Sequence, residues 1–454
     1  MPAPPARTVR VWCRTGEDPS LQAPCAVVTQ SGGSFLRHST SRTVGGHSER
    51  KASLASAALA LALVAAAPSA ASPAAEHWIE SWHAAPARPR PPGPGVPEGY
   101  ASPVLDDQTI VQDMRLSAGG RRVRVRLTNE FGDRPLRIGA AKIALATPWM
   151  PTPPGASRSL TFSGETSVVI PLGATLLSDP VELSAGDLAN VRISLYLPEP
   201  TRVCTCHAVG LQMATISPRG DYTASSFTPV AGTENRAFIS GVQVETGARL
   251  PVIVAFGDSV TDGDGSGSSR NGRWTDRLAE RLQGAGGGAV ANGGISGNQL
   301  LRDAANPPAG DAGLKRFDRD VLGVAGVTHV IILEGANDIG LGGAAPPSAE
   351  ALIAAYQQLI ARGHAHGVKV IGATLTPFGG SPYFRPETEA VRQRVNAWIR
   401  SGHAFDGVID FEAVLRDPAA PQKLRTDLQT GDGLHPNPAG YRAMGDAIEL
   451  GLFR

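Results

Sequence analysis

The chain has 454 residues, more than one ordinary hydrophobic core organises, so we expect two domains. Hydrophobic residues make up 42% and charged residues 18% of the chain, and the formal net charge is +1. This globular composition lacks the basic surplus of a nucleic-acid-binding protein and the acidic surplus of a metal store or solvating tail.

Residues 50–71 have the order of features found in a secretory signal peptide. Two basic residues, Arg50 and Lys51, precede a run of small apolar residues, and Ser69-Ala70-Ala71 supplies a cleavage site. The apolar run is shorter than a typical membrane span, so we expect a secreted protein without stable membrane insertion after cleavage. An uncleaved N-terminal anchor is the alternative. Upstream, residues 1–49 are rich in Arg and Ser and are interpreted as a non-structural leader that follows a start site assigned too early.

Residues 76–245 predict an all-β domain. Val123, Val125 and Leu127 alternate with arginines, which is the period of a half-buried strand. Before them, Gly119-Gly120 predicts a hairpin turn from the preceding alternating strand. Further strands are expected at residues 136–145, 167–172, 191–197 and 238–245. Many short strands without intervening helices favour a β-sandwich.

Cys204 and Cys206 are the two cysteines of this region. A disulfide between them is possible but strained, because residues two apart lie near the geometric limit for a bridge. With His207 they form a Cys-x-Cys-His sequence, yet no further Cys or His cluster completes a set of four metal ligands. A structural loop is therefore favoured over a metal site.

Residues 250–454 predict an α/β domain. Continuous apolar runs, typical of strands buried on both faces, occur at residues 252–256, 330–333, 368–375 and 408–411. Helical patterns separate them, including one that begins near Ser348 and one that buries Trp274. Alternating strands and helices indicate a parallel sheet with helices on both faces, whose active site lies at the carboxyl ends of the strands.

Two segments of this domain carry the residue types of a serine hydrolase. Ser259 follows the first apolar run directly, where a strand-to-helix turn would expose its hydroxyl. Near the C-terminus, Asp432 and His435 are three residues apart, so the carboxylate can orient the imidazole. Each segment alone is weak evidence for catalysis. An ordinary turn could contain the first, and an aspartate that caps a helix could account for the second.

Two further segments can supply hydrogen-bond donors to an oxyanion. Gly297 ends the glycine-rich stretch that begins at Asn292, and Asn337 lies in Gly335-Ala336-Asn337-Asp338. A glycine N–H and an asparagine amide both suit this task. Asp258, Asp338 and Asn292 are interpreted as structural residues that hold these loops.

The ordered set of Ser259, Gly297, Asn337 and Asp432 with His435 resembles the four signature blocks of the SGNH (GDSL-type) hydrolase superfamily. This resemblance, over residues 250–454, implies a flavodoxin-like, three-layer α/β/α domain with a parallel sheet, preceded here by the all-β sandwich. It also implies a serine esterase with Ser259, Asp432 and His435 as the catalytic triad. The N–H groups of Ser259 and Gly297 and the Asn337 amide would form the oxyanion hole, and no metal or cofactor would be needed.

Three longer stretches, at residues 257–263, 316–320 and 374–380, resemble a secreted branch of this superfamily associated with xylan degradation. The resemblance implies a deacetylase of plant polysaccharide. A lipase or phospholipase acting on lipid esters is the alternative, and Tyr383 could either line a pocket or belong to a packed loop. A carbohydrate-binding protein with an inactive hydrolase domain is the alternative of another class. The sequence leaves the role of the β domain open between substrate presentation and structural support.

Overall fold

The computed structural model describes residues 76–94, 96, 101–148, 150–203, 205–343 and 345–454, and the backbone of β1 (Trp12–Arg14) and β2 (Gln22–Pro24). Residues Ala71–Arg454 form one compact unit, separate from Met1–Ala70. The predicted leader lies outside the described residues apart from those two short strands, and the signal peptide and Cys204 lie outside them entirely. The signal peptide therefore stays a prediction, and the question of a disulfide between Cys204 and Cys206 stays open.

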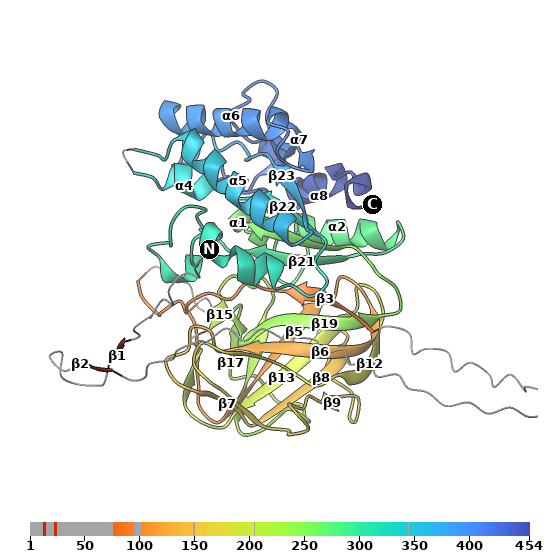
Figure 1. Ribbon diagram of the computed structural model, residues 1–454. Helices are drawn as coiled ribbons and strands as arrows, with labels where there is room; N and C mark the ends of the chain where they lie inside the picture. Colours follow the sequence, from red (N-terminus) through yellow and green to blue (C-terminus); the bar gives the residue numbers. More distant parts are fainter. Residues whose placement is uncertain are drawn as a thin grey trace, which may run out of the picture. The chain divides into compact units, whose positions relative to one another are not determined.

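The first part of the unit is an all-β region with two larger antiparallel sheets (Figure 1). The first sheet contains β3 (His77–His83), β6 (Gly120–Thr128), β11 (Thr175–Leu177), β12 (Val181–Ala185) and β19 (Ile239–Thr246). The second contains β5 (Gln108–Arg115), β8 (Ala140–Ala146), β9 (Arg158–Ser159), β13 (Asn190–Leu197), β16 (Ala214–Arg219) and β17 (Ala231–Thr233). Short ladders join β4 (Val104–Leu105) to β14 (Thr201–Arg202), β7 (Leu136–Ile138) to β10 (Val168–Ile170), and β15 (Cys206–His207) to β18 (Arg236–Ala237).

The predicted hairpin at Gly119-Gly120 is wrong. β5 pairs with β13 and β16, whereas β6 pairs with β11, β12 and β19, so the chain crosses here from one sheet to the other. In a hairpin, the two strands would lie side by side in one sheet. Their apolar faces would point to the same side, and another layer of the protein would have to cover them. Instead, the apolar residues of β5 and β6 are buried in one hydrophobic cluster. Ser81 holds the crossover, because its Oγ accepts a hydrogen bond from the Ala118 N–H at 3.0 Å.

The strand expected at residues 136–145 is two strands that pair with different partners. β7 pairs with β10 and β8 pairs with β13. Gly139 separates them, and a Cβ at this glycine would lie 2.8 Å from the ring of Tyr196. The chain can change partner here because glycine tolerates that close approach.

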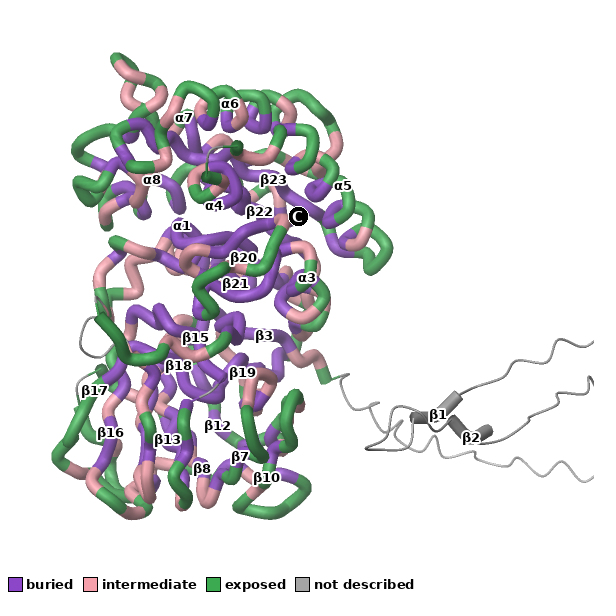
Figure 2. Tube along the Cα trace, turned by 90° about the vertical axis from the view of Figure 1, so that its left-hand side faces the viewer, coloured by how far each residue is buried: buried purple, intermediate pink, exposed green. Residues whose placement is uncertain are grey.

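The second part of the unit confirms the predicted parallel sheet. It contains β20 (Val252–Gly257), β21 (Ala289–Gly294), β22 (His329–Leu333), β23 (Lys369–Ala373) and β24 (Gly407–Ile409), in the order β21-β20-β22-β23-β24. All residues of β20 and β22 are buried, as the purple tube in Figure 2 shows, so both faces of the sheet are covered.

Helices separate the strands of this sheet and follow its last strand. They are α1 (Ser259–Asp262), α2 (Trp274–Gln283), α3 (Gly313–Phe317), α4 (Ala336–Gly340), α5 (Ala349–Ala365), α6 (Pro386–Ser401), α7 (Phe411–Leu415) and α8 (Pro438–Ala447). α5 begins as predicted, because the Ser348 side chain accepts a hydrogen bond from the N–H of Ala351 and caps the helix. Within the described part of the chain, we find no helix with the length and apolar character of a membrane span.

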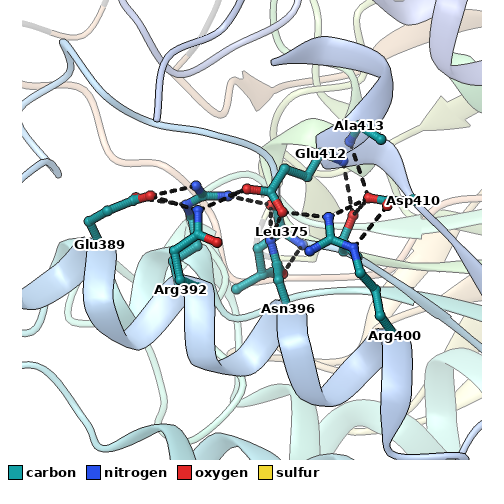
Figure 3. Close-up of polar contacts among 10 residues, drawn as sticks. Leu375, Glu389, Arg392, Asn396, Arg400, Asp410, Glu412 and Ala413 are labelled. Atoms are coloured by element: carbon teal, nitrogen blue, oxygen red, sulfur yellow. Dashed lines mark hydrogen bonds and ion pairs between the residues drawn. The ribbon is translucent and has the colours of Figure 1, made fainter. Parts of the chain in front are cut away.

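A buried polar network anchors α6 to the end of β23 (Figure 3). Arg392 and Asn396 of α6 each donate a hydrogen bond to the backbone carbonyl of Leu375, at 3.0 and 2.8 Å. Glu412 of α7 accepts from Asn396 at 3.0 Å and pairs with Arg392 at 2.8 Å. Because these buried polar groups satisfy one another, the network holds the segment directly after β23 against α6.

Candidate functional site

The strand order places a crevice between β20 and β22. Of the five strands in this sheet, β20 comes first in the sequence but second in the sheet. The connection from β20 therefore leads to one edge of the sheet, and the connection from β22 leads toward the other edge. In parallel sheets, ligands bind at the carboxyl end of the strands at such a switch point. Ser259 follows β20 and Asn337 follows β22, so the fold brings both predicted residues to this edge.

Ser259 is the first residue of α1 and is buried. The side chain of Asp258 caps this short helix by accepting a hydrogen bond from the N–H of Val260 at 3.0 Å. Gly257 precedes it, and a Cβ there would lie 2.3 Å from the carbonyl oxygen of Leu333. The tight packing of β20 against β22 thus requires glycine before the serine.

The structure brings Ser259, His435 and Asp432 into one hydrogen-bonded chain. His435 Nε2 lies 2.9 Å from Ser259 Oγ, and His435 Nδ1 lies 2.6 Å from Asp432 Oδ2. A carboxylate accepts hydrogen bonds, so the imidazole proton lies on Nδ1 and Nε2 accepts from the serine hydroxyl. This is the arrangement in which a histidine can remove the proton of a serine.

The loop that carries His435 also holds Asp432 in its ionised form. Asp432 Oδ1 accepts hydrogen bonds from the N–H groups of Leu434 and His435 at 2.8 and 2.9 Å. Partial burial raises the pKa of Asp432, but the hydrogen bonds from His435 and Leu434 lower it to about 2. Because this pKa is depressed, the carboxylate stabilises the fold above its ordinary pKa of 3.8, and that stabilisation is lost as the pH falls toward 2.

The glycine between these residues is required by the packing of the loop. Gly433 has φ +73°, and a Cβ on it would lie 2.8 Å from the backbone of Gly380. A side chain here would be strained by its backbone conformation and by the contact. The loop after β23 and the loop of His435 therefore pack directly on each other.

The two predicted oxyanion donors lie on neighbouring loops. Gly297 has φ +81°, and no described residue accepts a hydrogen bond from its N–H. Asn337 Nδ2 donates to the carbonyl oxygen of Asn298 at 2.9 Å, which joins the loop of Gly297 to the loop of Asn337. One amide hydrogen of Asn337 is used in this bond, and the second is left for another acceptor.

Tyr383 determines which way the Asn337 amide faces. The tyrosine hydroxyl donates to Asn337 Oδ1 at 2.7 Å, so the Nδ2 group must face Asn298. A Cβ at Gly340 would lie within 2.1 Å of the tyrosine ring, so the ring packs closely on α4. The sequence left the role of Tyr383 open, and this contact adds it to the site as a positioning residue.

The aspartates and the asparagine interpreted as structural make loop contacts. Asp338 accepts hydrogen bonds from the N–H groups of Leu300 and Leu301 at 2.6 and 2.9 Å. Asn292 lies inside β21 rather than after a strand, and its amide donates to the carbonyl oxygen of Thr261 at 2.8 Å. These bonds hold the loops that carry the candidate donors.

We expect Asp258→Asn to stabilise the protein at alkaline pH. Burial is the largest influence on Asp258 and raises its pKa from 3.8 to about 7. The folded state therefore resists ionisation, and stability falls as the pH rises through the interval between these two values. Asparagine can still accept from Val260, so denaturant unfolding should show a gain on the order of 2–4 kcal/mol at pH 8 and less at pH 5. The exposed Glu387→Gln serves as control, and an equal gain at both pH values would contradict the assignment.

Arg316 is a functional candidate that the sequence identified only as part of a family-like stretch. It is buried and donates hydrogen bonds to the carbonyl oxygens of Gly257 and Gly293, at 3.0 and 2.7 Å. Its Nε also donates to Asn298 Oδ1 at 2.8 Å. One guanidinium thus holds together the ends of β20 and β21 and the loop that carries Gly297 and Asn298. Nothing in the local sequence pattern distinguishes such an arginine from a surface residue.

Comparison with known proteins identifies the class of the domain that contains this site. Residues 255–443 match the model of the GDSL-like Lipase/Acylhydrolase family. This part of the chain, with its parallel sheet, is therefore a domain of the SGNH/GDSL hydrolase superfamily. No curated protein sequence matches the chain.

Several solved structures are similar to this part of the chain. An Enterococcus faecalis lipase/acylhydrolase is 24% identical and covers 44% of this chain and 93% of its own, with a TM-score of 0.35. An M. smegmatis aryl esterase is 20% identical over 43% of this chain and 95% of its own, with a TM-score of 0.34. A Sinorhizobium meliloti carbohydrate acetylesterase family member is 17% identical over 44% of this chain and 96% of its own, with a TM-score of 0.37.

Proposed function

We propose that the protein is a secreted serine esterase that hydrolyses carboxylic esters through an acyl-enzyme intermediate. The observation that carries this proposal is the chain of hydrogen bonds from Ser259 Oγ through His435 to Asp432. It lies in the region that matches the acylhydrolase family, which supports ester hydrolysis as the reaction. The contact between serine and histidine supports a serine nucleophile.

In the proposed reaction, Ser259 Oγ attacks the ester carbonyl carbon while His435 Nε2 takes the hydroxyl proton. Asp432 keeps the imidazolium oriented and stabilises its charge. The oxyanion of the tetrahedral intermediate accepts hydrogen bonds from the N–H groups of Ser259 and Gly297 and from the Asn337 amide. Collapse of this intermediate releases the alcohol, which takes the proton from His435. Water then attacks the acyl carbon while the same imidazole takes its proton. When the bond from the acyl carbon to Ser259 Oγ breaks, the carboxylic acid leaves and His435 returns the proton to the serine oxygen.

The substrate class we propose is an acetylated plant polysaccharide such as xylan, supported by the resemblance of three sequence stretches to a xylan-associated branch. The test compares kcat/KM on acetylated xylan, on p-nitrophenyl acetate and palmitate, and on phospholipid vesicles, with Ser259→Ala as the control. Acetate release from xylan, with short esters preferred over long ones, would support the proposal. Preference for palmitate or phospholipid would make the protein a lipase. Binding to xylan without hydrolysis of any ester would refute the esterase function.

Export is proposed from residues 50–71 alone. The test expresses the full chain in a bacterial host and sequences the N-terminus of the protein recovered from the medium. We expect a mature chain that begins directly after Ala71. Recovery from the membrane fraction with these residues retained would identify an uncleaved anchor instead.

We expect Asn337→Ala to lower kcat with little change in KM. The amide is proposed to bind the oxyanion, which exists only near the transition state, so the ground-state complex should not weaken. Loss of one such donor costs a factor on the order of 10²–10³ in kcat. The exposed Asn306→Ala, whose side chain makes no capping bond, is the control in steady-state kinetics. An effect confined to KM would contradict the role given to Asn337.

A further inference from the structure

His207 lies outside the four signature blocks but contacts the helix that carries Ser259. It is in β15 of the all-β region and is buried. Its Nδ1 lies 3.0 Å from the carbonyl oxygen of Ala85, and its Nε2 lies 2.8 Å from Asp262 Oδ1. Asp262 is the last residue of α1, three residues after Ser259. A side chain of the all-β region therefore contacts α1, the helix that carries Ser259, directly.

The contacts of His207 favour a buried imidazolium–carboxylate pair. The carbonyl oxygen of Ala85 accepts hydrogen bonds only, so Nδ1 carries a proton. A carboxylate oxygen of Asp262 faces Nε2, so both ring nitrogens of His207 face acceptors, which favours a proton on each. Burial has the largest influence on His207 and lowers its pKa, but Asp262 and the Ala85 carbonyl outweigh it, and the net shift is upward. Arg273 opposes this shift, and its Nε donates to the backbone carbonyl oxygen of Asp262 at 2.6 Å.

The other oxygen of Asp262 holds the loop that carries Gly297. Asp262 Oδ2 accepts a hydrogen bond from the N–H of Ser296 at 2.8 Å. The Ser296 Oγ lies 2.8 Å from Asp262 Oδ2 and 2.9 Å from Asp264 Oδ1, and its one proton is shared between these two acceptors. Ser296 directly precedes Gly297, whose free N–H is the proposed oxyanion donor. Asp262 is thus bound on one side by His207 and on the other by the oxyanion loop. Both of its oxygens are used, and its side chain is 3% exposed.

We propose that His207 is a positioning residue for the oxyanion loop. It neutralises and fixes Asp262, and through Asp262 it holds the Ser296–Gly297 turn at the distance from Ser259 that the reaction requires. Without His207, the buried carboxylate would lose the partner that holds its Oδ1, and it would turn toward water or toward Arg273. Displacement of the turn would weaken the bond from Gly297 to the oxyanion more than it weakens substrate binding. This inference rests on the proposed function.

The first test compares His207→Gln and His207→Ala with the wild-type full chain on p-nitrophenyl acetate. Glutamine keeps one hydrogen-bond donor but no positive charge, and it serves where the alanine variant does not fold. We expect both variants to lower kcat about 10- to 100-fold with KM within about twofold, since misplacement by about 1 Å costs up to that factor. Each kcat is divided by the concentration of sites that react with a fluorophosphonate, so that unfolded protein does not lower the measured kcat. A change in KM alone, or unchanged kcat, would overturn the proposal.

The chain provides a matched control for the loss of a histidine–aspartate pair. His364 Nε2 lies 2.8 Å from Asp406 Oδ2, the same separation as in the pair of His207 and Asp262. His364 is on α5, and its exposed side chain pairs with Asp406, which lies between α6 and β24. We expect His364→Ala to leave kcat and KM unchanged. An equal loss of kcat in this variant would show that the effect of His207 is not specific.

A double-mutant cycle tests whether His207 acts through Asp262. If it does, the variant with both His207→Gln and Asp262→Asn should lose no more kcat than the more impaired single variant. If the kcat losses of the two single variants multiply in the double variant, His207 does not act through Asp262, and the proposal is overturned.

Should the wild-type protein hydrolyse no ester, the proposed function fails, and the positioning role is then judged from the rate at which the fluorophosphonate labels Ser259. Slower labelling in His207→Gln would support the role, whereas equal labelling, or none in the wild type, would overturn it.

Discussion

Ser259→Ala is expected to abolish turnover while leaving the fold intact. The change removes the Oγ that lies 2.9 Å from His435 Nε2 and no other hydrogen bond of that side chain is found among the described residues. Loss of the nucleophile of a serine triad lowers kcat by a factor on the order of 10⁶. The measurement is the rate of p-nitrophenyl acetate hydrolysis at saturating substrate, with thermal unfolding as the check on folding.

The matched control for this variant is Ser401→Ala. Ser401 is exposed at the end of α6, where its hydroxyl donates to the carbonyl oxygen of Ala397. It should retain full activity and react with a fluorophosphonate like the wild type. Residual hydrolysis by Ser259→Ala above a few per cent, in protein free of wild-type enzyme, would exclude Ser259 as the nucleophile.

Asp432→Asn is expected to produce the second-largest loss, because it reverses the imidazole tautomer. The N–H groups of Leu434 and His435 both donate to Asp432 Oδ1, so the oxygen of an asparagine would stay in that position. Its NH₂ group would then face His435 Nδ1 and donate to it, which moves the ring proton to Nε2. A protonated Nε2 cannot accept the proton of Ser259. In a serine triad this substitution lowers kcat by about 10⁴.

The alanine variant distinguishes a tautomer effect from simple loss of charge. Asp432→Ala removes the carboxylate but imposes no tautomer, so we expect it to keep more activity than Asp432→Asn. The exposed Asp427→Asn, in the same segment, is the control and should be fully active. Both site variants are compared by kcat on the same soluble ester. Loss of less than about tenfold in Asp432→Asn would contradict an orienting role for Asp432.

Local patterns in the sequence were enough to predict the structural class of each part of the described chain, all-β for the first and α/β for the second. Period-two alternation in residues such as Val123 and Val125 predicted antiparallel strands, and continuous apolar runs predicted the buried parallel strands, because burial on one or both faces selects these patterns. The motif residues Ser259, Gly297, Asn337 and His435 were identifiable for a related reason. Ser259, Gly297 and Asn337 each follow a strand at the same edge of the sheet, so strand order sets their position. His435 comes after α7 instead, and its spacing from Asp432 identified it.

The tertiary structure alone decided which segments meet. A Gly-Gly step between two alternating strands is compatible with a hairpin or with a crossover, and only the packing of two sheets selects the crossover at Gly119-Gly120. The hydrogen bond from Tyr383 to Asn337 and the pair of His207 and Asp262 join residues 46 and 55 positions apart. Periodicity reports the burial of one segment at a time, whereas a contact between distant segments depends on how whole sheets and loops pack.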